Sequence, residues 1–232
     1  MKPDFDVFRG ARIAFDLDGT LVDTAPDLVR ALNACTRSEG FDPVPVAAVR
    51  AMVGRGARAL IRRAYERAGA PEPDEATVER RLDVFMDTYR SEIAIESRPF
   101  EGVIDALDLF AAHGAELSVC TNKPTSLAVA LLNELGMADR FVRIIGPEDA
   151  PAKKPDPRHL EVAIGGPADA KTALVGDSEP DALSARAAGA RSVLFSGGYS
   201  EKPARTLGAD RLFSHWNEAP ALLAGVFAES GA

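Results

Sequence analysis

Two aspartates, two positions apart, follow a short apolar run near the start of the chain. Asp16 and Asp18 come directly after residues 11–15 and directly before Gly19. Side chains alternate along an extended chain, so both carboxylates can point the same way, and a glycine lets the backbone turn there without a Cβ clash. One carboxylate of such a pair can attack phosphorus while the other transfers the proton. The full run of residues 11–24 favours phosphoryl transfer through an aspartyl-phosphate. A pair of aspartates without this context would equally fit an acidic turn after an ordinary strand.

Further polar residues follow other apolar runs along the chain. They are Thr121 and Asn122 after residues 117–120, Lys154 in the segment Ala-Lys-Lys-Pro-Asp-Pro, and Asp177 and Asp181 after residues 173–175. Ligands of open parallel sheets bind beyond the carboxyl ends of the strands, so we expect these side chains to lie together. Carboxylate oxygens suit Mg²⁺, which takes one or two protein carboxylates alongside a substrate phosphate. The hydroxyl of Thr121 and the amide of Asn122 could hold phosphate oxygens at a helix start.

Taken singly, each of these residues also fits a role without chemistry. Thr121 could end a strand, and Lys154 could be solvated, as most lysines are. Asp177 and Asp181 could cap a helix. Their common position after predicted strands is what favours a single site that binds both phosphate and metal.

The composition is that of a globular protein with an acidic balance. The 232 residues, 46% of them hydrophobic and 27% charged, can bury a sizeable core. A formal net charge of −8 argues against nonspecific binding to nucleic acid or to an anionic membrane surface. Cys35 and Cys120 give no disulfide framework, and no apolar run is long enough to span a bilayer. We expect a cytoplasmic protein, monomeric or homodimeric, whose partner is a small phosphorylated metabolite.

Short apolar runs alternate with helical stretches over most of the chain. Strands are predicted at residues 11–15, 117–120, 143–145, 173–175, 192–195 and 209–213. Helices are predicted at residues 102–112, 125–135, 158–164, 180–188 and 217–227. Gly189 follows the fourth of these helices as a C-terminal cap. Such alternation is typical of βαβ units, so we expect an α/β fold with a Rossmann-like parallel sheet.

One long segment interrupts the alternation. Helical periodicity without a convincing strand extends over residues 21–91, with helices expected at 27–38, 46–52, 57–68 and 74–91. We expect this segment to be an inserted, all-helical cap domain, and residues 1–20 and 92–232 to form the α/β core. Closure of such a cap over a site would exclude bulk water.

Four segments, in this order, resemble the four motifs of the haloacid dehalogenase superfamily phosphatases. They are Phe-Asp-Leu-Asp-Gly-Thr-Leu-Val-Asp-Thr from residue 15, Cys-Thr-Asn-Lys from residue 120, Lys-Lys-Pro-Asp-Pro from residue 153, and Val-Gly-Asp-Ser-Glu-Pro-Asp from residue 175. The resemblance extends over nearly the whole chain. The helical insertion is similar to the first type of cap domain in that superfamily.

The resemblance implies a role for each of these residues. Asp16 would be the nucleophile and Asp18 the general acid and base. Mg²⁺ would bind Asp16, the backbone carbonyl of Asp18 and the carboxylate of Asp177, with Asp181 supporting the last of these. Lys154 would restrain Asp16. The phosphoryl group would be bound by Thr121, Asn122 and Lys154.

Within the superfamily, two segments resemble phosphoglycolate phosphatases most. They are Gly-Asp-Ser-Glu-Pro-Asp-Ala-Leu-Ser-Ala-Arg-Ala-Ala-Gly from residue 176 and Phe-Ser-Gly-Gly-Tyr from residue 195. The resemblance implies that 2-phosphoglycolate is hydrolysed to glycolate and phosphate. One departure stands out, because this chain has Gly146-Pro147-Glu148 where relatives usually have Gly-Gly-Asp.

The cap also holds a segment similar to the glycine loop of that family, Val-Gly-Arg-Gly from residue 53. The planar guanidinium of Arg55 would suit bidentate pairing with a substrate carboxylate, although an exposed arginine between two glycines is the alternative. Further arginines at 58, 62 and 63 would make the cap face cationic, or would face solvent.

Other functions compatible with these motifs stay open. A broader phosphatase acting on nucleotides, sugar phosphates or pyrophosphate, and a sugar-phosphate mutase, would share Asp16 and Asp18. A ligand-binding protein that has lost turnover, or a dehalogenase, would have no need of Asp18. Schiff-base phosphonate hydrolysis needs a cap lysine. No lysine occurs between Lys2 and Lys123, so the sequence argues against that reaction.

Overall fold

The centre of the molecule is a parallel sheet of six strands. The structure, a computed structural model, describes residues 3–50 and 56–229. The strand order is β5-β4-β1-β6-β7-β8, with every neighbouring pair parallel. The strands are β1 (Arg12–Phe15), β4 (Glu116–Cys120), β5 (Arg143–Ile145), β6 (Thr172–Gly176), β7 (Arg191–Phe195) and β8 (Arg211–Phe213). All six lie where the sequence predicts strands, and the α/β fold is confirmed.

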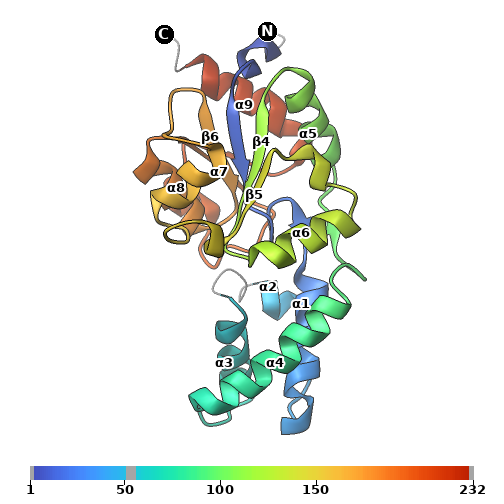
Figure 1. Ribbon diagram of the computed structural model, residues 1–232. Helices are drawn as coiled ribbons and strands as arrows, with labels where there is room; N and C mark the ends of the chain where they lie inside the picture. Colours follow the sequence, from blue (N-terminus) through green and yellow to red (C-terminus); the bar gives the residue numbers. More distant parts are fainter. Residues whose placement is uncertain (1–2, 51–55, 230–232) are drawn as a thin grey trace.

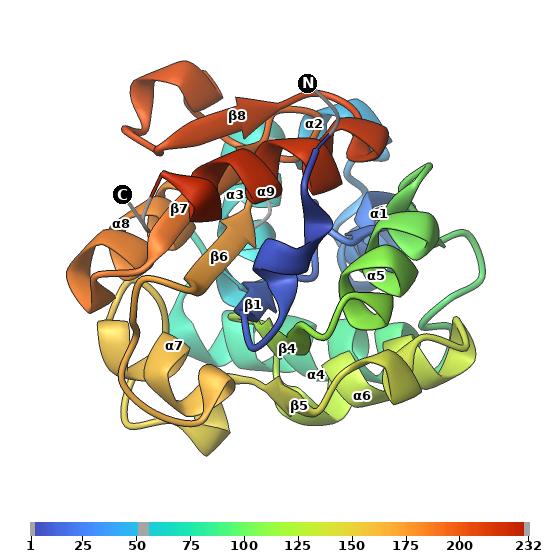
Figure 2. The same cartoon turned by 90° about the horizontal axis from the view of Figure 1, so that it is seen from above.

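The two faces of the sheet are covered by different helices. Ile13 and Phe15 of β1 pack into the larger apolar cluster, with α5, α6 and α9, whereas Ala14 packs into the smaller one, with α7 and α8. This follows from the alternation of side chains along a strand. Figures 1 and 2 show α7 and α8 on one side of the sheet and α5 on the other. The helices are α5 (Val103–Ala112), α6 (Thr125–Glu134), α7 (Pro157–Ile164), α8 (Glu179–Ala188) and α9 (Ala219–Ala228).

The helices of the insertion lie beyond the carboxyl ends of the strands. They are α1 (Ala25–Thr36), α2 (Val46–Arg50), α3 (Ala57–Arg67) and α4 (Glu75–Ser91). Figure 1 shows them below the sheet, at the opposite end of the molecule from the two chain termini. The predicted helical insertion is therefore confirmed. In the described part of the chain, no helix is both long enough and apolar enough to cross a membrane.

One short element in the insertion is not helical. Val22–Asp23 forms β2, which pairs antiparallel with β3 (Arg98–Pro99), so the two chain crossings between the sheet and the cap helices run side by side. A strand of two residues is too short to leave a period-two pattern in a sequence. This pair of short strands was therefore not predicted, although the two strands frame the path of the chain into and out of the cap.

Asp27 ties the first cap helix to the segment that returns from the last one. Its carboxylate is fully buried and accepts hydrogen bonds from the Ser97 N–H at 2.8 Å, the Ser97 hydroxyl at 2.6 Å and the Glu96 N–H at 3.1 Å. Arg30 adds an ion pair at 2.7 Å. Buried carboxylates that lose such donors are costly, because their desolvation is no longer offset. The two crossings are thus held together where the cap joins the core.

We expect Asp27→Asn to lower the free energy of unfolding by about 2–3 kcal/mol, because the amide cannot accept all of these hydrogen bonds. Chemical denaturation, followed by the fluorescence of Trp216, measures the change. The control is Asp87→Asn, at a side chain that is 83% exposed, for which we expect a change under about 0.5 kcal/mol. Equal effects at the two positions would show that Asp27 does not hold the crossings together.

Candidate active site

Asp16 and Asp18 lie where β1 leaves the sheet. The N–H of Asp16 still donates to the Val175 carbonyl, at 2.8 Å, and the chain then turns at Gly19. Gly19 has a φ of +85°, and a Cβ at this position would lie 2.6 Å from Oδ2 of Asp177. Only glycine combines that conformation with so close an approach. The turn predicted from the sequence therefore also makes room for the carboxylate from β6.

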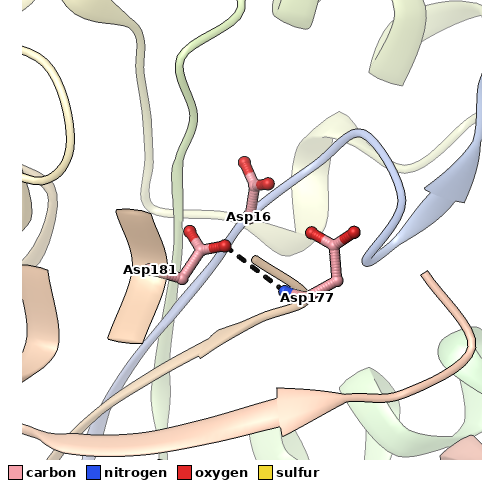
Figure 3. A group of neighbouring side chains, drawn as sticks. All are labelled: Asp16, Asp177 and Asp181. Atoms are coloured by element: carbon pink, nitrogen blue, oxygen red, sulfur yellow. Dashed lines mark hydrogen bonds between the residues drawn. The ribbon is translucent and has the colours of Figure 1, made fainter. Parts of the chain in front are cut away.

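Three carboxylates converge at this edge of the sheet. Asp16, Asp177 and Asp181 each place an oxygen within 4.8 Å of the others. Figure 3 shows the three side chains gathered at this edge of the sheet. Gly176 permits the close approach of Asp181, because a Cβ at position 176 would lie 2.3 Å from Cγ of Asp181. Burial, together with the charges of Asp16 and Asp181, raises the pKa of Asp177 well above its usual value. Carboxylate oxygens crowded in this way suit a divalent cation that neutralises them.

Asp181 is held by the start of its own helix. Its Oδ2 accepts hydrogen bonds from the Ser178 hydroxyl at 2.6 Å, the Ser178 N–H at 3.0 Å and the Asp177 N–H at 3.3 Å. Its Oδ1 accepts from Nζ of Lys154 at 2.6 Å. The helix-capping role considered for Asp181 is thus present in the structure, as a capping box with Ser178. Because both oxygens are engaged, the arrangement suits a residue that supports the metal site rather than one that binds the ion directly.

Lys154 links two of the three carboxylates. Its buried ammonium lies 2.9 Å from Asp16 Oδ1 and 2.6 Å from Asp181 Oδ1. Burial alone would lower the pKa of Lys154, but Asp16 and Asp181 more than offset this, so that the pKa lies above its usual value. Burial raises the pKa of Asp16 to about 6 although Lys154 opposes it. Lys154 is therefore a charged, fixed group beside the proposed nucleophile, and the solvated alternative for this lysine is wrong.

Thr121 and Asn122 follow β4 and line the same cavity as Asp16 and Asp177. Thr121 is buried, and its hydroxyl accepts from the Lys123 N–H at 3.2 Å. The side-chain amide of Asn122 donates to the Lys154 carbonyl at 3.1 Å. Asn122 thus holds the Lys154 segment in place through a direct contact. Binding of phosphate by either residue stays a prediction.

Lys123 is a functional candidate that the sequence analysis did not single out. Its Nζ lies 3.1 and 3.2 Å from the two carboxylate oxygens of Asp18, and it donates to the Tyr89 hydroxyl of α4 at 2.7 Å. Burial alone would lower the pKa of Lys123, but Asp18 and Tyr89 raise it overall. The signal available in the sequence was its place directly after Thr121 and Asn122. Its partner Tyr89 is 34 positions away, and only the fold brings the two together.

Tyr199 is a second candidate that was missed as an individual residue. Its N–H donates to Asp177 Oδ2 at 2.5 Å. Its hydroxyl accepts from the Ala25 N–H at 3.0 Å and donates to the Asp23 carboxylate. Tyr199 therefore connects the carboxylate at the end of β6 to the start of the cap.

A cavity of about 540 Å³ lies between the carboxylates and the cap. Its core side includes Asp16, Asp18 and Asp177, and its cap side is largely apolar. The apolar lining from the cap helices includes Leu28, Leu60, Leu82, Phe85 and Met86. The site is thus a pocket between the core and the cap, partly open to solvent, with room for a small substrate.

Arg55, the predicted reader of a substrate carboxylate, lies outside the described residues. The neighbouring arginines pair with acidic side chains: Arg58 with Glu79, Arg62 with Glu72 and Glu75, and Arg63 with Glu201. The expectation that these three arginines make the cap face cationic is therefore not met, because their charges are balanced within the protein.

The sequence pattern of the haloacid dehalogenase-like hydrolases matches residues 13–195. The chain belongs to this family. A phosphoglycolate phosphatase from Caulobacter vibrioides is 49% identical over 218 residues, covering 91% of this chain and 90% of the relative. One from Mesorhizobium japonicum is 39% identical over 208 residues, covering 88% and 91%. The crystal structure of a predicted phosphoglycolate phosphatase from Haemophilus somnus superposes with a TM-score of 0.84 at 28% identity, covering 92% of this chain and 97% of that one.

The departure from the family pattern, Gly146-Pro147-Glu148, has a structural role in this haloacid dehalogenase-like hydrolase. Oε2 of Glu148 accepts from the Thr125 N–H at 3.1 Å and so satisfies an N–H in the first turn of α6. The Gly146 N–H donates to the Thr125 hydroxyl at 2.9 Å. The loop therefore fixes the start of the helix that follows Thr121, Asn122 and Lys123.

His159 holds the Lys154 segment from the other side. Its Nδ1 accepts from the Lys154 N–H at 3.0 Å, and its side chain is fully buried. Burial, followed by the charge of Lys154, lowers the pKa of His159 from 6.5 to about 4. The imidazole is therefore neutral in the folded protein at neutral pH and can keep accepting this hydrogen bond.

This lowered pKa makes folding stability depend on pH. Between about pH 6.5 and pH 4 the unfolded chain protonates His159 and the folded protein does not, so this contribution is present above pH 6.5 and is lost as the pH falls toward 4. We expect the wild type to lose about 2 kcal/mol more than His159→Asn between pH 7 and pH 5, measured by chemical denaturation. The control is His215→Asn, at an exposed position. Identical pH dependence in wild type and His159→Asn would refute the assignment.

Proposed function

We propose that this protein is a Mg²⁺-dependent phosphatase that hydrolyses 2-phosphoglycolate to glycolate and phosphate through an aspartyl-phosphate. One observation carries the proposal: Asp16 lies beside the buried Lys154 and within a cluster of carboxylates, at the wall of the cavity between the core and the cap. The names of the relatives from Caulobacter vibrioides and Mesorhizobium japonicum support this choice of substrate.

The carboxylate cluster fits the metal that this function needs. Asp16, the backbone carbonyl of Asp18 and the carboxylate of Asp177 would hold Mg²⁺, with Asp181 in support. When bound, the ion would neutralise charge on the phosphoryl oxygens. Lys154, next to Asp16, would add a second positive charge on the side of the site that binds the phosphoryl group. The residues present therefore match the charge that a phosphate dianion brings.

The chemical steps follow from the positions of the two aspartates. A carboxylate oxygen of Asp16 attacks phosphorus, and the bond from phosphorus to the glycolate oxygen breaks. Asp18 gives its proton to that oxygen, so that the leaving group departs as an alcohol. Asp18 then takes a proton from water, which attacks phosphorus and returns the Asp16 carboxylate. Thr121 and Asn122 would hold phosphoryl oxygens throughout.

Initial rates of phosphate release with Mg²⁺ test the proposal. The panel contains 2-phosphoglycolate, hexose phosphates, nucleoside monophosphates and pyrophosphate. We expect kcat/KM for 2-phosphoglycolate to exceed the others by about tenfold or more, which corresponds to about 1.4 kcal/mol of transition-state binding. A flat or hexose-favouring profile would retain the phosphatase chemistry and reject this substrate.

A further inference from the structure

The ammonium of Lys123 is a buried cation at the wall of the substrate cavity. The Lys123 side chain is 4% exposed, yet it lines the cavity together with Asp16 and Asp18. Its two hydrogen-bond partners are the Asp18 carboxylate and the Tyr89 hydroxyl. An ammonium has three N–H donors. Their acceptors are the two Asp18 oxygens, at 3.1 and 3.2 Å, and the Tyr89 hydroxyl, at 2.7 Å. Two of the three donors thus go to one carboxylate, so an anionic ligand in the cavity could take one of them while Asp18 keeps the other.

The position of Asp18 fixes where a leaving group must lie. If Asp18 protonates the leaving oxygen, that oxygen lies within hydrogen-bond distance of its carboxylate, about 2.6–3.2 Å. Nζ of Lys123 is 3.1 Å from Oδ1 and 3.2 Å from Oδ2 of the same group. In 2-phosphoglycolate the carboxylate oxygens are three bonds from the leaving oxygen, within about 3–4 Å. The substrate carboxylate can therefore reach Lys123 while the leaving oxygen lies beside Asp18.

The other cations at the cavity have acidic partners of their own. Arg90, which lines the cavity from α4, is 58% exposed and lies 3.9 Å from Asp87. Lys154 pairs with Asp16 and Asp181 on the phosphate side. Arg58, which lines the cavity from α3, is paired with Glu79 and is 53% exposed. A salt bridge of that kind is largely screened by water, whereas a buried ammonium attracts an anion strongly. Among the described residues, Lys123 is thus the cation best placed for a carboxylate next to the leaving oxygen.

We propose that Lys123, held by Tyr89 from the cap, is the residue that selects a carboxylate-bearing leaving group. This inference rests on the proposed function and adds to it the residue that recognises the substrate. Tyr89 is a positioning residue, because it touches Lys123 and would not touch the reacting atoms. The simpler alternative is that Lys123 only balances the charge of Asp18, in which case all alkyl phosphates would depend on it equally.

Two substrates separate these alternatives. 2-Phosphoglycolate and 2-hydroxyethyl phosphate both have an alkoxide leaving group that needs Asp18, but only the first has a carboxylate. We expect Lys123→Met to lower the ratio of their kcat/KM values by about 10- to 100-fold, the usual effect of losing a charge-assisted hydrogen bond. Tyr89→Phe should lower the same ratio by less. The control Lys171→Met changes a lysine just before β6, at the opposite edge of the sheet, and should leave the ratio unchanged.

Each outcome has a distinct meaning. An equal loss for both substrates in Lys123→Met overturns the proposal and assigns Lys123 to Asp18 alone. If the wild type itself does not prefer 2-phosphoglycolate to 2-hydroxyethyl phosphate, the proposed substrate is wrong whatever Lys123 does. Hydrolysis of p-nitrophenyl phosphate, whose leaving group needs little protonation, shows whether a variant is folded. Should Lys123→Met fail to fold, Lys123→Gln keeps a donor toward Asp18 and Tyr89, and the same ratio decides.

Discussion

Replacement of Asp16 by asparagine is expected to remove Mg²⁺-dependent phosphate release while making the metal-free protein more stable. The activity should fall by about a thousandfold or more, because an amide cannot form the phosphoryl-enzyme and the nucleophile usually carries an effect of this size. Phosphate release with 2-phosphoglycolate measures the loss. The matched control is Asp139→Asn, at an exposed position, which should retain the wild-type rate.

The stability gain follows from the pKa of Asp16. Burial raises this pKa from 3.8 to about 6. Between these two pH values the carboxyl group is therefore protonated in the folded protein and ionised in the unfolded chain. The contribution of Asp16 to stability is therefore present below about pH 3.8 and is lost as the pH rises through 6. At pH 7.5 without metal, we expect Asp16→Asn to raise the free energy of unfolding by about 1–3 kcal/mol. A destabilised variant would mean that the Asp16–Lys154 ion pair outweighs the cost of burying the carboxylate.

Replacement of Lys154 by methionine has the opposite effect on stability. The ammonium lies 2.9 Å from Asp16 and 2.6 Å from Asp181, and its loss leaves two buried carboxylates without their cation. Removal of one partner of a buried ion pair costs about 3–5 kcal/mol, which we expect here in the metal-free protein. Activity should also fall by about a hundredfold or more, since a fixed charge beside the phosphoryl group is lost.

The adjacent lysine provides the control for this prediction. Lys153 is exposed, so Lys153→Met makes the same substitution one position earlier in the chain. We expect it to change the free energy of unfolding by less than about 0.5 kcal/mol. Chemical denaturation and phosphate release are measured on both variants. Similar losses at the two positions would contradict the assignment of the buried charge to Lys154 alone.

The core of the fold was predictable because its signals are local. Each strand of the parallel sheet is a short apolar run, and the residue that follows it lies at the same edge as the residues that follow the others. Asp16, Thr121 and Asp177 could therefore be brought together without a structure. The turn at Gly19 was predictable for the same reason, since a glycine between polar residues marks a change of direction.

The contacts between the cap and the core were not predictable in this way. Tyr89 contacts Lys123 across 34 positions, and Tyr199 contacts Asp23 across 176. Such pairs depend on how the cap is placed against the sheet, which no periodicity encodes. The cap arginines also depend on the fold. In the sequence Arg58 resembles a free cation, and only the fold places Glu79 beside it.

Transfer of the phosphoryl group through Asp16 is tested most directly by rapid-quench kinetics on Asp18→Asn with p-nitrophenyl phosphate. This leaving group needs little protonation, so the enzyme should still be phosphorylated, whereas attack of water on the phosphoryl-enzyme should be slow without Asp18. We predict a burst of about one equivalent of nitrophenolate per enzyme, with a hydroxylamine-labile phosphate on the peptide that contains Asp16. Slow, linear release with no phosphorylated peptide would contradict the account, because the phosphoryl group would then pass directly to water.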